Sequence, residues 1–223
     1  DEAPPAIVSI FLGDELDAIV DALIKGDEYH SAEAISMDLG VAVLPQFLKD
    51  NTDRNRTSPF AFTGNKFEFR MPGSAVNLSD CNMILNTAVA KSLKDFADAC
   101  EGLEGAEFEK KAISYVRQLL TDHKRIIFNG NGYSEEWQEE AARRGLANHR
   151  NTAEALPCFV SQKSIDLFAE FGILSESEVH SRYEVKLDKY TKLLNIEARV
   201  MIRMARRTYL PAISKYMRDL AET

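Results

Sequence analysis

The spacing of apolar residues near the end of the chain restricts the fold more than any other sequence feature. From Val179 to Ala205, apolar side chains recur every three or four residues, which places them on one face of a helix. Ser175 and Glu178 precede this run in the order of a capping box, a pattern that begins a helix. We expect Pro211 to kink or interrupt the helix near its position, because proline lacks the amide hydrogen. The last part of the chain is therefore expected to be one long helix.

The same periodicity predicts shorter helices earlier in the chain. Gly26 is expected to end the first of them, and Gly145 the last. Ser134 is a plausible N-cap, with acidic residues in the following turn, where the helix dipole favours negative charge. The predicted helices span approximately residues 14–25, 78–99, 108–120 and 134–144.

Residues 65–71 give the clearest strand signal. Apolar and charged side chains alternate there with a period of two, which puts the two kinds on opposite faces of a strand. Further extended segments are expected at residues 6–12 and 126–128. The sequence thus predicts an α+β fold, with a few strands early in the chain and a predominantly helical C-terminal region. The apolar face would carry Phe67, Phe69 and Met71, and the charged face Lys66, Glu68 and Arg70.

Composition excludes several classes of protein. The 223 residues carry a formal net charge of −8, which argues against a nucleic-acid or anionic membrane partner. No stretch approaches the roughly 20 apolar residues of a membrane helix. Cys81, Cys100 and Cys158 are too few and too scattered for a disulfide framework, so we expect free buried thiols and a cytoplasmic location. The chain begins with Asp rather than Met, so we expect it to be part of a longer protein.

The charged strand face has two interpretations. Glu68 could bind a divalent cation while Lys66 and Arg70 hold anionic groups on either side. Alternatively, the three side chains form ordinary pairs on a solvated sheet face. A hairpin between residues 58 and 65 would bring Arg56 beside this face, where its planar guanidinium suits phosphate oxygens. Arg56 could equally belong to a basic surface loop.

Other candidate sites are weaker. Glu2 stands on a proline-stiffened segment and could be only a polar terminus. The four histidines lack the spacing of metal ligands and share no helix face, so we interpret them as surface or packing residues. The Asn-Gly-Asn-Gly sequence at 129–132 lacks the longer glycine motifs of phosphate-binding loops, and we interpret it as a tight turn.

Four segments together resemble glutamine synthetase, particularly its large third type. The two long ones are Glu2-Ala-Pro-Pro-Ala-Ile-Val-Ser-Ile-Phe-Leu-Gly13 and Asn55-Arg-Thr-Ser-Pro-Phe-Ala-Phe-Thr-Gly-Asn-Lys-Phe-Glu-Phe-Arg70. The second resembles the Asn-Arg-Ser and Arg-x-Glu-x-Arg elements of that family, with Lys66 in place of the first arginine of the strand. Phe128-Asn-Gly-Asn-Gly-Tyr-Ser134 and Asn195-Ile-Glu-Ala198 are also similar to third-type sequence.

This resemblance implies ATP-dependent ligation of ammonia to L-glutamate through a γ-glutamyl phosphate. It implies that Glu2 lies on a flap and helps to remove a proton from ammonium, and that Arg56 contacts the transferred phosphoryl group. Lys66 would lie near the nucleotide phosphates, Glu68 would bind Mg²⁺ or Mn²⁺, and Arg70 would lie near the glutamate substrate. Positioning and charge neutralisation of this kind are what phosphoryl transfer requires.

The resemblance also implies how the chain is organised. Residues 1–100 would be the C-terminal portion of the catalytic domain, with a helical insertion at about 13–50, and residues 101–223 a helical C-terminal region. The early strands would be antiparallel and would belong to a larger catalytic sheet. The family forms homo-oligomers, here by resemblance a dodecamer, and its remaining metal ligands precede Asp1. We therefore expect the isolated chain to be inactive.

A second hypothesis assigns the chain to a different class. It would be a helical oligomerisation or interaction module without catalysis, with residues 134–144 and 175–220 as the functional part. This hypothesis predicts that reversing the charge at Glu68 leaves every activity of the complete protein intact.

Overall fold

This computed structural model describes residues 7–29, 36–37, 47–48, 57–73 and 76–222. The chain divides into two compact units, Asp1–Arg150 and Asn151–Thr223, and each is described by itself. Helices dominate, and they accompany a small mixed sheet, so the predicted α+β class is confirmed. The functional boundary expected near residue 100 stays a prediction.

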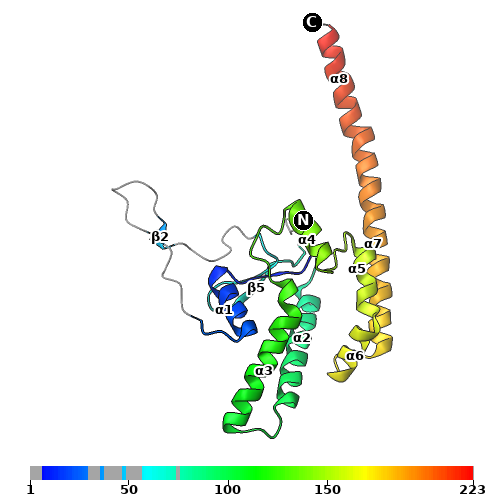
Figure 1. Cartoon of the computed structure of the whole chain (residues 1–223). Helices are drawn as coiled ribbons and strands as arrows, with labels where there is room; N and C mark the ends of the chain where they lie inside the picture. Colours follow the sequence, from blue (N-terminus) through cyan, green and yellow to red (C-terminus); the bar gives the residue numbers. More distant parts are fainter. Residues whose placement is uncertain (1–6, 30–35, 38–46, 49–56, 74–75, 223) are drawn as a thin grey trace. The chain divides into compact units, whose positions relative to one another are not determined.

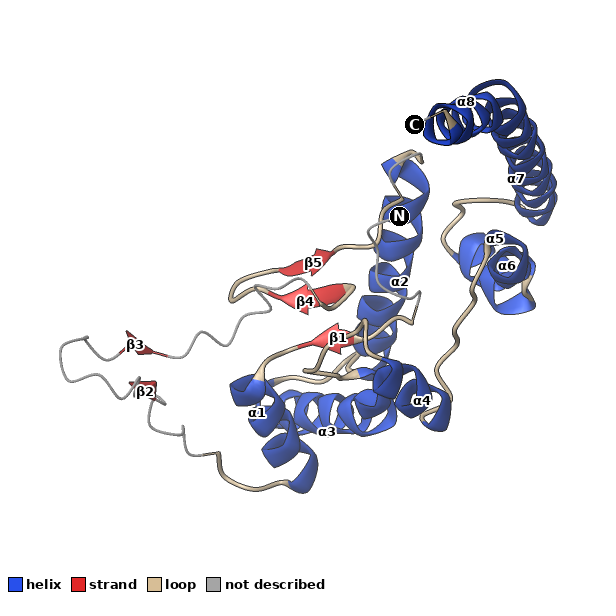
Figure 2. Cartoon of the chain, turned by 90° about the horizontal axis from the view of Figure 1, so that it is seen from above, coloured by secondary structure: helices blue, strands red, loops and turns tan. Residues whose placement is uncertain are grey.

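The sheet of the first unit has the strand order β1–β4–β5, with β1 at Ile10–Phe11, β4 at Phe60–Phe62 and β5 at Phe67–Phe69 (Figure 2). β4 and β5 form the predicted antiparallel hairpin. β1 and β4, in contrast, are parallel, so the expectation of antiparallel strands is wrong for this pair. Parallel strands require a crossover connection, and the long stretch between β1 and β4, which contains a helix, supplies one. A bridge from Ile10 to Ile127 adds a further extended segment beside β1.

The apolar face of the hairpin consists of aromatic rings. Phe60 stacks on Phe67 at 5.5 Å between ring centroids and meets Phe69 edge-on at 5.9 Å. Phe62 also contacts Phe67 at 5.3 Å. These pairs are cross-strand neighbours or diagonals, the contacts that stabilise a short antiparallel ladder. The strand alternation predicted from the sequence is therefore confirmed.

Three helices accompany this sheet. α1 (Asp14–Lys25) ends at Gly26, whose φ of 81° is the left-handed value that ends many helices. α2 (Leu78–Ala99) and α3 (Gly105–His123) run side by side as a hairpin (Figure 1). Phe96 of α2 contacts two rings of α3 edge-on, at 6.4 and 5.5 Å between centroids. These helices lie where the apolar periodicity places them.

The main core cluster of the first unit surrounds Trp137 on α4 (Glu135–Arg143). Trp137 is buried with Ile7 and Ala141, and its ring stacks on Phe128 at 3.8 Å between centroids. Ser134 caps α4 through its side chain, as predicted from the sequence.

The described residues of the segment expected to be a helical insertion are partly helical and partly extended. α1 covers its beginning, and β2 (Ser36–Met37) pairs with β3 (Phe47–Leu48) in an antiparallel ladder further on. The sequence reasoning missed this ladder, because both strands are two residues long and too short to show a period.

The second unit consists of helices. α5 (Thr152–Ala155), the 3₁₀ segment η2 (Leu156–Val160) and α6 (Gln162–Glu170) precede α7 (Glu176–Met204). The predicted capping box is present, because the Ser175 side chain accepts the Glu178 amide hydrogen while the Glu178 carboxylate accepts that of Ser175. The N–H of Ser175 lowers the pKa of Glu178, so this cap weakens as the pH falls through that lowered value.

The interruption expected at Pro211 is also present. A π-helical segment, η3 (Ala205–Tyr209), separates α7 from α8 (Leu210–Ala221), which carries Pro211 in its first turn. The proline ring would collide with the carbonyl oxygen four residues earlier in a regular α-helix, and the wider π turns relieve that collision. The helix therefore changes from α to π geometry at Ala205–Tyr209 and continues as α8.

The cysteines partly contradict the prediction. None of the three forms a disulfide, and Cys100 is buried, but Cys81 is half-buried and Cys158 is exposed, so the expectation that all are buried is wrong. Cys158 lies in η2, whose five residues are all half-buried or exposed. No helix among the described residues is long and apolar enough to cross a membrane.

Candidate functional site

The charged face of β5 is the candidate site. Lys66 and Arg70 flank the strand, and Glu68 lies at its centre opposite Ala61 of β4, which is buried. The turn that leads into β5 is closed by Thr63, whose backbone N–H and side-chain hydroxyl both donate to the Lys66 carbonyl, at 2.9 and 3.2 Å. At the other end, the Arg70 N–H donates to the Pro59 carbonyl at 2.7 Å, so the hairpin fixes the backbone of this face at both ends.

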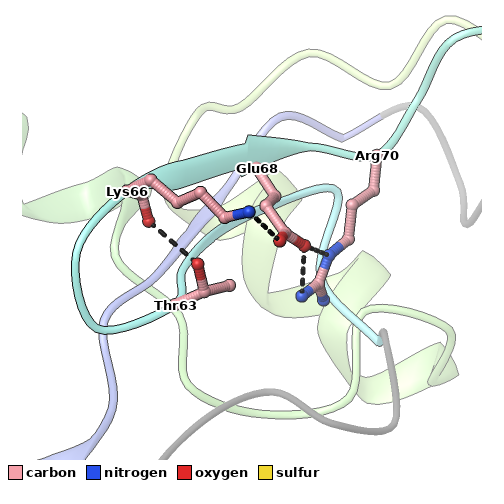
Figure 3. Close-up of polar contacts among 4 residues, drawn as sticks. All are labelled: Thr63, Lys66, Glu68 and Arg70. Carbon is pink, nitrogen blue, oxygen red and sulfur yellow. Dashed lines mark hydrogen bonds and ion pairs between the residues drawn. The ribbon is translucent and has the colours of Figure 1, made fainter.

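The two cationic side chains, Lys66 and Arg70, converge on the Glu68 carboxylate (Figure 3). Arg70 donates from Nε and from one terminal nitrogen to Glu68 Oε2, at 3.2 and 3.1 Å. Lys66 Nζ lies 3.4 Å from the other oxygen, Oε1. The exposed fractions of the side chains are 65% for Lys66, 37% for Glu68 and 16% for Arg70. Arg70 is thus a largely buried anchor, and Lys66 can reach a ligand from the solvent side.

The cations determine the charge state of Glu68. The hydrogen bond from Arg70, followed by that from Lys66, lowers the pKa of the Glu68 carboxyl. Glu68 is therefore ionised at neutral pH, and the attraction that it contributes is lost as the pH falls through the lowered value. The cluster carries two positive charges and one negative charge, an arrangement that suits an anionic ligand with a bound cation.

Glu68 fits one ligand of a divalent cation, because it is an ionised carboxylate with partly exposed oxygens. It does not complete such a site by itself. Across the described part of the chain, no group of three or more His, Cys, Asp or Glu side chains could hold a metal ion. Further metal ligands would have to come from residues other than the described ones.

The loop at 129–132 positions the segment that follows Glu2. The Asn129 side-chain carbonyl accepts the backbone N–H groups of Leu12 and Gly13, both at 3.0 Å. Its amide donates to Asp17 Oδ2 at 3.0 Å. Asn129 therefore joins the end of β1 to the first turn of α1, which has no side-chain cap of its own at Gly13.

The same loop also holds the segment that follows Arg56. The Gly132 N–H donates to the Thr57 carbonyl at 2.9 Å. A Cβ at position 132 would lie 2.3 Å from that carbonyl oxygen, so only glycine fits this approach. The tight turn predicted from the sequence is confirmed, since Asn131 accepts the N–H groups of Tyr133 and Ser134.

Replacing Gly132 with alanine is expected to destabilise the first unit by about 1–3 kcal/mol, the usual cost of forcing a carbon atom into a filled space. The backbone must shift at Thr57, next to Arg56. Urea denaturation followed by far-UV circular dichroism measures the change. Gly73→Ala is the matched control, because its new carbon would meet side-chain carbons of Val76, the nearer at 3.3 Å, and no backbone atom within 4 Å. Equal losses in both variants would contradict the assignment.

The structure thus brings together three of the predicted site residues, Lys66, Glu68 and Arg70, on one face of β5. The other two, Glu2 and Arg56, lie outside the described residues. Sequence reasoning missed the positioning roles of Asn129 and Gly132. The only available signal was the Asn-Gly-Asn-Gly sequence itself, which indicated a turn but not its partners.

Comparison with known proteins identifies relatives of this chain. Residues 111–223 match the family described as the glutamine synthetase C-terminal domain. The chain is 43% identical over 225 residues to "Type-3 glutamine synthetase" of Dictyostelium discoideum, a match that covers 100% of the chain. It is 41% identical over 221 residues to "Glutamine synthetase" of Butyrivibrio fibrisolvens, and 39% identical over 226 residues to that of Bacteroides fragilis; each match covers 99% of the chain.

These matches cover only part of the relatives. The chain spans 30% of the Dictyostelium discoideum protein and 31% of each of the two bacterial proteins. The charged face of β5 precedes the region matched by the family and falls within the region matched by the relatives.

Proposed function

Because this chain belongs to the glutamine synthetase family, we propose that it supplies part of the active site of a glutamate–ammonia ligase. The observation that carries the proposal is the convergence of Lys66 and Arg70 on Glu68 along one exposed strand face. In the proposed reaction, the γ-carboxylate of L-glutamate attacks the γ-phosphorus of ATP, which releases ADP and forms γ-glutamyl phosphate. Ammonia then displaces phosphate at the carbonyl carbon, which gives glutamine.

The described residues can supply charge and position to this reaction. Lys66 would approach the nucleotide phosphates, because its ammonium group is the most exposed of the three. Arg70 would hold a carboxylate of L-glutamate through its planar guanidinium. Fixed cations around a transferring phosphoryl group stabilise the charge that spreads over its oxygens. The hairpin backbone holds both cations in place before the substrates bind.

Glu68 would be one ligand of Mg²⁺ or Mn²⁺. When bound, such a cation neutralises phosphate oxygens during phosphoryl transfer. Glu68 would keep its contact with Arg70 and so remain ionised and oriented. The proposal includes two further residues of this chain, Arg56 as a contact of the transferred phosphoryl group and Glu2 as a group that takes a proton from ammonium.

The proposal extends to the cellular setting. The protein would work in the cytoplasm as a homo-oligomer, with L-glutamate, ammonia and ATP as its small-molecule partners. The isolated chain would be inactive, because the described residues hold a single candidate metal ligand in this cluster and no complete metal site.

A chimera tests the proposal. The 223 residues replace the matching part of the Bacteroides fragilis relative, to which the chain is 39% identical. We expect the chimera to form glutamine from glutamate, ammonia and ATP, and the isolated chain to form none. The intact relative serves as the positive control. A chimera that assembles like the intact relative yet makes no glutamine would contradict the proposal, as would turnover by the isolated chain.

A further inference from the structure

The second half of the long C-terminal helix lacks a packing partner within its own unit. α5, η2 and α6 lie beside the first half of α7 only, and no element of that unit lies along α8 (Figure 1). Every residue from 191 to 222 is exposed except Ala205, which is half-buried. Isolated helices are marginal in water, because most helical stability in proteins comes from packing an amphipathic face.

The exposed surface has an apolar face of the kind that normally packs. In α8, four large apolar side chains recur at three- and four-residue spacing, and each is more than half exposed: Leu210, Ile213, Met217 and Leu220. In α7, the apolar side chains of Val200, Met201 and Met204 are also exposed. Exposed apolar side chains gathered on one helix face mark an interaction surface.

This apolar face is accompanied by basic side chains. Residues 189–218 contain eight Lys or Arg and one Glu, a net charge of +7 in a chain whose total is −8. The remainder of the chain therefore carries −15. Among the described residues, none of the ion pairs involves Arg199, Arg203, Arg206 or Arg207. A surface that complements this face in hydrophobicity and charge is apolar and acidic.

The tip of the α2–α3 hairpin has that chemistry. Residues 95–109 contain six Asp or Glu and no Lys or Arg. Lys91 and Lys94 pair with the two aspartates of this tip. Its four glutamates, at 101, 104, 107 and 109, are exposed and form no ion pair with any described residue. On α2, Val89 and Leu93 are exposed one turn apart, which gives the hairpin an apolar strip close to its acidic tip.

We propose that the basic apolar face of α7–α8 in one copy of this chain docks on the α2–α3 hairpin of a second copy. Pairing of two C-terminal helices with each other would instead bring two +7 segments together. In a two-fold dimer the proposed contact occurs twice, since each copy donates its helix and receives that of the other. The proposal does not rest on the ligase reaction and can fail independently of it.

Sedimentation velocity of the full 223-residue chain tests the proposal. We expect a dimer at micromolar concentration, and about a tenfold or larger rise in its dissociation constant between 0.05 and 0.5 M NaCl, because salt screens exposed charges. The double variant Arg203→Glu/Arg206→Glu is expected to weaken the dimer by about 100-fold, since it reverses both charges. Lys25→Glu/Lys163→Glu is the matched control: it changes the net charge equally on other surfaces, and its dimer should persist.

A mixing experiment shows which surface receives the helix. Glu104→Lys/Glu107→Lys alone should also be monomeric. When this variant is mixed with Arg203→Glu/Arg206→Glu, a heterodimer should form. In one of its two contacts both the helix and the hairpin carry reversed charges, and in the other both are native, so each contact joins opposite charges. Ile213→Gln/Met217→Gln, which leaves the charge unchanged, should weaken the dimer while the helical circular dichroism signal persists.

Any of the following results would overturn the proposal. The first is a wild-type chain that stays monomeric at 100 µM. The second is a dimer that survives reversal of both arginines, or two charge variants that stay monomeric when mixed; docking of the helix within its own chain would give this last result. The third is a monomer that binds vesicles containing phosphatidylserine, which would assign the face to a membrane.

Discussion

Replacing Trp137 with alanine is expected to lower the free energy of unfolding of the first unit by about 3–5 kcal/mol, the range for removing a large buried aromatic side chain. Trp137 is 1% exposed and lies at the centre of the main core cluster, with Ile7 and Ala141. Its ring stacks on Phe128 at 3.8 Å, and the Arg144 guanidinium lies over it at 5.4 Å from the ring centroid. The truncation removes all of these contacts and leaves a cavity.

The loss of stability should extend to β1, an edge strand of the sheet. Arg144 donates to the Ile127 carbonyl at 2.9 Å, and Ile127 bridges to Ile10 of β1. Hydrogen exchange in Trp137→Ala should therefore increase at residues 7–13 as well as in α4. Trp137→Phe is the control, because phenylalanine can keep the stack on Phe128, and we expect about half the loss or less. A decrease below about 1 kcal/mol for alanine would show that the cluster is not the main core of this unit.

The helices were predicted well because their signals are local. The periodicity of α1, α2 and α3, the Ser134 cap and the Ser175–Glu178 box all lie within one or a few turns of chain. α5 and α6 were missed as separate elements although Asn151 and Ser161 cap them; α5 has only four residues, which leaves no room for a period.

Contacts between distant residues could not be predicted in this way. The stack of Phe128 on Trp137 and the parallel pairing of β1 with β4 depend on crossovers that the local pattern does not encode. Asn129 reaches across more than a hundred residues to Leu12 and Gly13. The charged face of β5, in contrast, follows from the strict alternation of residues 65–71, so three of the five predicted site residues could be placed from the sequence.

Replacing Glu68 with glutamine is expected to reduce glutamine formation by the chimera about 100-fold or more, the scale of losing one preorganised charged group at a phosphoryl-transfer site. Glutamine keeps the size of the side chain and removes its charge. Arg70 and Lys66 then lose the carboxylate that holds them, and the metal loses a ligand. Thermal stability should fall only modestly, because Glu68 is 37% exposed and the glutamine amide oxygen can still accept a hydrogen bond from the largely buried Arg70. An activity defect without a folding defect would therefore locate Glu68 in the active site.

Substitutions at the two cations beside Glu68 distinguish the effect of side-chain charge from that of side-chain geometry. Lys66→Arg restores the first arginine of the family's strand motif and should keep most of the activity, because it preserves the positive charge on the exposed side. Arg70→Lys keeps its charge but loses the planar fork that makes two hydrogen bonds to Glu68, so we expect a large decrease. If Glu68→Gln and Arg70→Lys both retained full activity, the charged face would be an ordinary solvated surface. The alternative of a helical interaction module without catalysis would then describe this chain better.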